Sequence, residues 1–224
     1  MDDVLMSAPL FSALDAEAAA ALKASMDERR LFKGDVLFAE GEPGDRLYVV
    51  TSGKIKLGHA SGDGRESLMA IMGEGQMFGE LSLFDPGPRT STATALTDVS
   101  VLGLGHAALR PWLTGRPEVA ESLLQALAQR LRRTNDAMAD LVFSDVPGRV
   151  AKALLDLGER FGQPAPDGLH VTHDMTQEEL AQLVGASRET VNKALADFAQ
   201  RGWLKLESRS VVLIDIERLG RRAR

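Results

Sequence analysis

Apolar and polar positions follow three different patterns along this chain of 224 residues. An alanine-rich stretch near the N-terminus predicts a helix over Phe11 to Met26, with Asp15 as its N-cap. Between residues 31 and 104, short apolar or alternating stretches are separated by glycine turns, which predicts a β-roll or small barrel. The expected strands are Arg46 to Thr51, Lys54 to His59, Ser67 to Met72, Thr92 to Leu96 and Val99 to Leu104.

A long helical pattern follows from Arg116 to Phe143, without glycine or proline after Pro117. Positions at alternating steps of four and three form a seam: Ala120, Leu124, Leu127, Leu131, Thr134, Met138 and Leu141. Such a heptad seam predicts a partner helix, with packing on the chain's own domain as the alternative. The polar Thr134 in the seam, beside Asn135, fits a role in fixing the register.

The helical pattern breaks at Asp145 to Gly148, a segment that contains Pro147. Because proline and glycine both oppose helix continuation, this segment predicts a hinge between domains. An amphipathic helix is expected at Val150 to Phe161, followed by a loop over Gly162 to Gly168.

Two helices joined by a sharp turn are predicted next. Thr176 and Glu179 form a capping box that opens the first helix, and Gly185 permits the turn. Ser187 caps a second helix that runs to about Gln200. Small or apolar residues stand where two crossing helices pack, so the pattern is that of a helix-turn-helix.

The second of these helices carries Arg188, Glu189 and Lys193 near its N-terminal end. In a major groove, arginine can pair with guanine and glutamate can accept from cytosine. An ordinary helical hairpin with a solvated outer face is the alternative.

A short hairpin is expected after this helix, with strands at Trp203 to Leu206 and Ser210 to Ile214. It would form a wing with Arg209 at its tip, where a cation suits a phosphate. The predicted DNA-binding module is therefore a winged helix-turn-helix.

Residues 79–90, GELSLFDPGPRT, have the features of a phosphate-binding segment. Gly79 ends a strand-like run, one helical turn follows at Glu80 to Phe84, and Arg89 returns after the rigid loop Asp85-Pro86-Gly87-Pro88. The N–H groups of the helical turn and the guanidinium favour an anion, while the carboxylate of Glu80 suits a sugar hydroxyl. Sugar and phosphate together indicate a nucleotide, and a plain glycine-proline surface loop is the alternative.

Composition excludes several classes of function. The absence of cysteine removes disulfides, thiolate-held iron–sulfur clusters and cysteine nucleophiles. No apolar run is long enough to span a bilayer and the N-terminus is acidic, so we expect a cytoplasmic protein without membrane contact. The net charge of −6 opposes DNA binding overall, yet the excess acid lies in residues 1–110, and residues 145–224 hold equal numbers of acids and bases.

The histidines give no sign of a metal site. His170 and His173 are three residues apart, and no nearby acid or thiol completes a metal site, while His59 and His106 stand alone. We therefore expect neither a metal site nor a catalytic residue, and no enzyme.

The segment GELSLFDPGPRT resembles the cyclic-nucleotide-binding cassette of the CRP/FNR family of bacterial regulators, and SRETVNKAL resembles the recognition helix of that family. The likeness runs from about Leu31 to the C-terminus. It implies an α+β fold with an N-terminal β-roll of the double-stranded jelly-roll type, a long dimerisation helix and a C-terminal winged helix-turn-helix. The corresponding domains are residues 1–115, 116–144 and 145–224.

This resemblance also implies site residues and partners. cAMP is the implied effector ligand, and Thr134 and Asn135 reach its base, one of them across a homodimer. The implied ligand residues are Phe78, Gly79, Glu80, Leu81, Ser82, Arg89, Thr90, Arg130, Thr134 and Asn135. The implied DNA-binding residues are Thr176, Gln177, Ser187, Arg188, Glu189, Thr190, Lys193 and Arg209. Double-stranded DNA with inverted TGTGA-like half-sites and RNA polymerase are the implied partners.

Two alternatives remain open from the sequence. Thr90 is a residue that some cGMP-binding cassettes use to contact guanine, so cGMP is a second candidate effector. A nucleotide-regulated subunit that does not bind DNA is the other. The family often has arginine where Lys193 stands, so bidentate base reading at that position is open.

Overall fold

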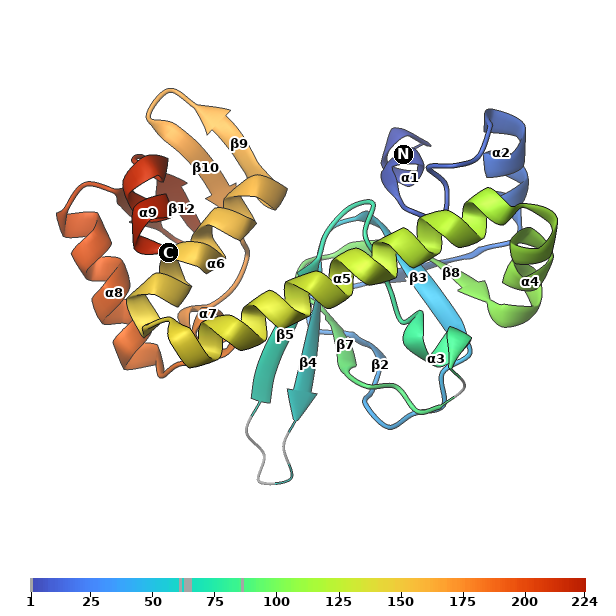
Figure 1. The fold of residues 1–224 in the computed structure, drawn as a ribbon, viewed down its shortest axis with the longest axis horizontal. Helices are drawn as coiled ribbons and strands as arrows, with labels where there is room; N and C mark the ends of the chain where they lie inside the picture. Colours follow the sequence, from blue (N-terminus) through green and yellow to red (C-terminus); the bar gives the residue numbers. More distant parts are fainter. Residues whose placement is uncertain (1, 61, 63–65, 86) are drawn as a thin grey trace. The chain divides into compact units, whose positions relative to one another are not determined.

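The computed structural model describes residues 2–60, 62, 66–85 and 87–224, which form two compact units (Figure 1). The first unit comprises residues 1–61 and 70–132, and the second comprises residues 62–69 and 133–224. Across the described ranges, no helix is both long and apolar enough to cross a membrane. The expected division at 1–115, 116–144 and 145–224 stays a prediction.

The first unit combines short helices with two four-stranded sheets. Its helices are α1 (Asp2–Ser7), α2 (Ala16–Ala24), α3 (Leu81–Phe84), α4 (His106–Gly115) and the first part of α5 (Pro117–Phe143). Its strands are β1 (Asp27–Leu31), β2 (Val36–Phe38), β3 (Arg46–Ser52), β4 (Ile55–Ala60), the last part of β5 (Glu66–Met72), β6 (Met77–Phe78), β7 (Thr92–Ala95) and β8 (Val99–Gly105).

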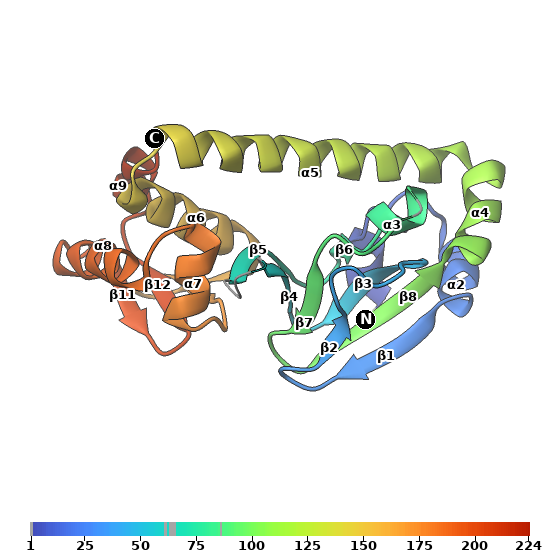
Figure 2. The same cartoon turned by 90° about the horizontal axis from the view of Figure 1, so that it is seen from below.

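The two sheets have the orders β1-β8-β3-β6 and β2-β7-β4-β5, and Figure 2 shows β1, β8 and β3 side by side. Strand β3 explains how the layers form, because successive side chains point to opposite faces. Leu47 and Val49 pack with the helices on one face, while Tyr48 and Val50 pack between the two sheets. Both faces are therefore buried, and the strand reads as a continuous apolar run.

The second unit combines helices with one four-stranded sheet of order β11-β12-β10-β9. Its helices are the last part of α5, α6 (Val146–Phe161), α7 (Gln177–Val184), α8 (Arg188–Gln200) and α9 (Ile216–Arg222). Its strands are β9 (Gly162–Ala165), β10 (Gly168–Thr172), β11 (Leu204–Glu207) and β12 (Ser210–Leu213). The fully buried Leu154 and Leu157 of α6 and Phe198 of α8 lie in its core.

Local signals in the helix-turn-helix are confirmed. Thr176 and Glu179 form both hydrogen bonds of a capping box, and Ser187 caps α8 by accepting from the N–H of Thr190. Gly185 has a φ of 69°, in the left-handed region that favours glycine. The two helices therefore begin and end where the sequence predicted.

Three other expectations were wrong in detail. The helix expected over residues 11–26 is α2, which begins only after its cap Asp15, so residues 11–14 precede it. The expected break at 145–148 is largely the first turn of α6, because Asp145 caps the helix and proline is tolerated in a first turn. The expected loop at 162–168 contains strand β9, which pairs with β10.

Helix α5 buries one face and exposes another. Val119 and Leu123 are buried in the first unit. The seam residues Leu124, Leu131 and Met138 are 66%, 62% and 63% exposed. An apolar stripe of this size on a single chain is the feature that a partner helix would cover.

Candidate functional site

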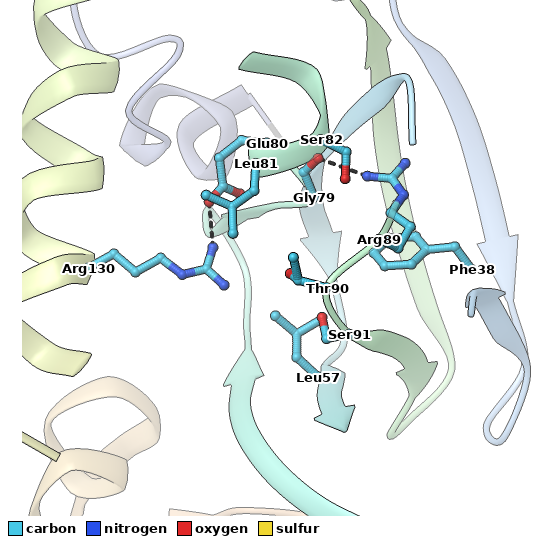
Figure 3. A pocket seen from close by; sticks show the side chains of 10 residues that line it. All are labelled: Phe38, Leu57, Gly79, Glu80, Leu81, Ser82, Arg89, Thr90, Ser91 and Arg130. Atoms are coloured by element: carbon cyan, nitrogen blue, oxygen red, sulfur yellow. Dashed lines mark hydrogen bonds and ion pairs between the residues drawn. The ribbon is translucent and has the colours of Figure 1, made fainter. Parts of the chain in front are cut away.

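A small pocket in the first unit brings together much of the predicted ligand site (Figure 3). It lies where β6 leads into α3 and where the chain approaches β7. Seven predicted residues line it: Gly79, Glu80, Leu81, Ser82, Arg89, Thr90 and Arg130. The sequence did not single out three further lining residues, Phe38, Leu57 and Ser91.

Gly79 allows the backbone to pass close to the pocket's cation. Its φ is 76°, and a Cβ placed on it would lie 2.9 Å from Nη1 of Arg89 and 3.2 Å from the carbonyl oxygen of Arg46. A side chain at this position would therefore strain the backbone and displace the guanidinium.

Arg89 is a buried cation, with only 5% of its surface exposed. Its Nη1 donates to the carbonyl oxygens of Arg46 and Gly79, each at 2.8 Å, and its guanidinium carbon lies 4.2 Å from the ring centroid of Phe38. Burial lowers the pKa of Arg89 from its ordinary value. Its Nε is buried and has no hydrogen-bond partner in the described part of the chain.

Glu80 is a buried acid, with 1% of its surface exposed. Its Oε1 accepts a hydrogen bond of 2.7 Å from Nη1 of Arg130, which reaches in from α5. Its Oε2 is buried and finds no partner among the residues that the structure describes. A buried carboxylate oxygen left in this state is costly, so the pocket retains a strong acceptor for an incoming hydroxyl.

The pocket thus offers a cationic donor and an anionic acceptor within one cavity. The cavity holds about 20 Å³, close to the roughly 10 to 15 Å³ that one water molecule needs. A larger ligand requires side chains at the mouth to move. Leu81, which is 46% exposed, and the Arg130 side chain, which is 38% exposed, are partly exposed side chains that line the pocket.

Other predicted ligand residues lie outside this cavity. The side chain of Phe78 is fully buried and stacks on Tyr48 with ring centroids 5.6 Å apart, and its contact with a ligand stays a prediction. Its apolar ring belongs to the core between the sheets. Thr134 and Asn135 are exposed on α5 in the second unit, and their contact with the base stays a prediction. Pro86, in the expected rigid loop, lies outside the described residues.

The predicted DNA-binding residues fall into two groups. Thr176, Ser187 and Thr190 take part in helix caps, so their hydroxyls already have partners. The others are exposed at the start of α7, on α8 and at the wing: Gln177, Arg188, Glu189, Lys193 and Arg209.

Two of the exposed side chains on α8 neutralise each other. Nζ of Lys193 lies 2.7 Å from Oε1 of Glu189 one turn away, and both side chains are about three-quarters exposed, at 74% and 78%. An exposed i,i+4 pair contributes only about 0.3 to 0.5 kcal/mol, so both groups can exchange partners readily.

The wing is fastened to the segment before α7. Arg209 at the wing tip has a φ of 58°, and its carbonyl oxygen accepts from the N–H groups of His173 and Asp174 at 3.2 and 3.0 Å. This arrangement leaves the Arg209 side chain exposed while its backbone is held.

Two histidines lie next to glutamates that are distant in the sequence. Nε2 of His170 lies 3.0 Å from Glu207, and Nδ1 of His59 lies 2.6 Å from Glu40, so neither stands apart from acids as the sequence suggested. The pKa of Glu207 is lowered to about 2 because Lys205 and His170 hydrogen-bond its carboxylate. Within the described ranges, no cluster of three or more metal-ligating side chains is found.

Comparison with known proteins assigns each half of the chain to a domain family. Residues 28–114 match the cyclic nucleotide-binding domain family, and residues 148–222 match the Crp-like helix-turn-helix domain family. The CRP-like cAMP-activated global transcriptional regulator of Mycobacterium tuberculosis is 58% identical over 224 residues, 100% of both chains. The cyclic AMP receptor protein of Thermus thermophilus is 36% identical over 203 residues, 90% of both chains.

A solved structure extends the likeness to the fold. FixK2 from Bradyrhizobium japonicum has a TM-score of 0.78 at 26% identity, and the match covers 88% of this chain and 96% of that one. The expected α+β fold, with an N-terminal β-roll and a C-terminal helix-turn-helix, is confirmed. The chain belongs to the CRP/FNR family of DNA-binding transcription regulators.

Proposed function

We propose that this chain is a homodimeric, cAMP-responsive regulator that binds double-stranded DNA. One observation supports the ligand most strongly: Oε2 of Glu80 and Nε of Arg89 are both buried and lack partners in the described part of the chain. A ribose hydroxyl donates to the first atom, and a cyclic phosphate accepts from the second. The name of the 58% identical relative, a cAMP-activated regulator, supports cAMP as the nucleotide.

In this proposal the charged residues of the pocket bind different parts of the nucleotide. Arg89 balances the phosphate charge, and the first turn of α3 adds backbone N–H groups that favour an anion. Glu80 accepts from the ribose and exchanges part of its contact with Arg130, which comes from α5. Thr134 and Asn135, farther along the same helix, bind the base. Ligand binding therefore acts on the long helix through its own side chains.

The DNA partner is recognised by the second unit. Helix α8 enters the major groove with Arg188, Glu189 and Lys193 toward the bases, while Arg209 of the wing binds a phosphate. Two copies joined along the α5 seam would bind an inverted repeat of TGTGA-like half-sites, spaced by about 34 Å.

Three functional parts follow from this scheme. Residues 1–115 bind nucleotide, residues 116–144 form the dimer, and residues 145–224 bind DNA. We further propose that the protein works in the cytoplasm and that RNA polymerase is its partner in transcription.

The first prediction concerns the pocket. Glu80→Gln keeps the size of the side chain and removes its charge, so cAMP affinity should fall about 10- to 100-fold, as expected for a charged hydrogen bond of about 1.5 to 3 kcal/mol. Glu74→Gln makes the same change at an exposed position outside the pocket and should leave affinity unchanged. Calorimetric titration with cAMP measures the affinity of both variants, and the same titration with cGMP compares the two nucleotides. Wild-type affinity in a folded Glu80→Gln variant would refute the site.

The second prediction concerns base reading. Arg188→Ala should lose about 1 to 3 kcal/mol of discrimination at one guanine, whereas Arg209→Ala should weaken all DNA sequences alike. Competition binding with single-base variants of an inverted repeat, at one salt concentration, distinguishes these effects. An unchanged base preference in Arg188→Ala would show that α8 is not the reader.

The third prediction concerns the dimer. Leu131→Glu places a charge in the exposed apolar seam and should shift the protein toward monomer. Gln129→Glu adds the same charge at an exposed position off the seam and should leave the dimer intact. Sedimentation equilibrium measures the association. If both variants dimerise as the wild type does, another surface forms the dimer.

A further inference from the structure

The C-terminal helix α9 is bound to the corner where α5 ends and α6 begins. Nη2 of Arg222 donates to both carboxylate oxygens of Asp145, at 2.8 and 2.6 Å. Oδ1 of Asp145 also accepts from the N–H of Gly148 at 2.9 Å, which caps α6. A single carboxylate therefore caps one helix and anchors another, and both helices belong to the second unit.

Packing brings the end of α9 close to the first turn of α6. Leu219 of α9 is fully buried. A Cβ on Gly148 would lie 3.3 Å from Nη1 of Arg222 and 3.3 Å from the Arg222 carbonyl oxygen. A residue larger than glycine at position 148 would force neighbouring atoms to shift. The position of Arg222 is therefore set by helix packing as well as by its charge.

The carboxylate of Asp145 is stabilised in its ionised form. The hydrogen bond from Arg222 is the main cause that lowers the pKa of Asp145, and the Gly148 N–H adds to it. Arg222 is 31% exposed and Asp145 is 63% exposed at the side chain. Such a pair contributes little to global stability. Its effect is to fix geometry, because one guanidinium nitrogen lies within hydrogen-bond distance of both carboxylate oxygens.

The same corner is held from its other side by α6. Nη1 of Arg149 donates to the carbonyl oxygen of Ser144 at 2.7 Å, while its Nε donates to Val184 at 3.1 Å and its Nη2 to Gly185 at 3.3 Å. One guanidinium thus joins the end of α5 to the turn of the helix-turn-helix. Each residue of the two-residue connection between α5 and α6 is therefore held by an arginine: Ser144 by Arg149 and Asp145 by Arg222.

We propose that Arg222 is a positioning residue that holds the α5–α6 corner, so that a change in α5 reaches α8 rather than being absorbed at the connection. This inference rests on the proposed function. Without the Arg222 contact, Asp145 still caps α6, but the backbone between α5 and α6 gains freedom to rotate. Nucleotide and DNA would each still bind, whereas their coupling would weaken.

The test uses the full-length protein and the ratio of DNA dissociation constants without and with saturating cAMP. Arg222→Gln should lower this ratio several-fold while the calorimetric affinity for cAMP stays at the wild-type value. Asp145→Asn keeps the capping oxygen and loses the charge, and it should lower the ratio similarly. Because both variants remove one contact, the double variant should show no further loss.

Two further variants separate geometry from charge. Arg221→Gln removes a neighbouring positive charge whose partner, Glu217, lies within α9 itself, and it should keep the wild-type ratio. Arg222→Lys keeps the charge on a shorter side chain without the planar guanidinium and should recover the ratio only in part. Circular dichroism and thermal unfolding establish that each variant is folded.

The outcomes distinguish this inference from the proposed function. A wild-type ratio of one would refute cAMP-controlled DNA binding, and with it any coupling through the corner. A wild-type ratio above one that persists in folded Arg222→Gln and Asp145→Asn would refute the positioning role alone. An equal fall in Arg221→Gln would also refute it, since the cause would then be general charge.

Discussion

Two opposite charges are buried together in the wall of the β-roll, where each needs polar partners to offset the cost of burial. Arg89 and Glu80 are 5% and 1% exposed, and each keeps one polar atom without a partner in the described part of the chain. Backbone carbonyls and the Phe38 ring hold the cation, and Arg130 holds the acid. The fold thereby maintains a costly polar cavity whose remaining bonds a ligand can complete.

Local sequence signals predicted local structure well. The capping box at Thr176 and the left-handed glycine at Gly185 are set by neighbouring residues, and both appear where expected. Pro147 was interpreted as a helix break, but proline is also tolerated in the first turn of a helix. Here Asp145 caps α6, so Pro147 lies in the first turn of that helix. Strand β9 was missed because its pairing with β10, rather than its composition, makes it a strand.

Contacts between distant residues could not be predicted from spacing. The family resemblance placed Arg130 in the site, but its pairing with Glu80 joins residues 50 positions apart. Phe78 was placed in the site by its neighbours in the cassette, yet strand alternation turns its ring into the core. Arg222 carried no signal at all, since its contact with Asp145 spans 77 positions and depends on how α9 packs.

Helix α5 is the proposed link between nucleotide binding in the first unit and DNA binding by the second. The most direct test is a titration of wild-type protein against an inverted-repeat DNA by fluorescence anisotropy, at one fixed salt concentration, with and without saturating cAMP. We expect tighter DNA binding with cAMP, by about 5- to 150-fold for a coupling of typical size. Equal DNA affinity in the two conditions, from protein that binds cAMP, would contradict it.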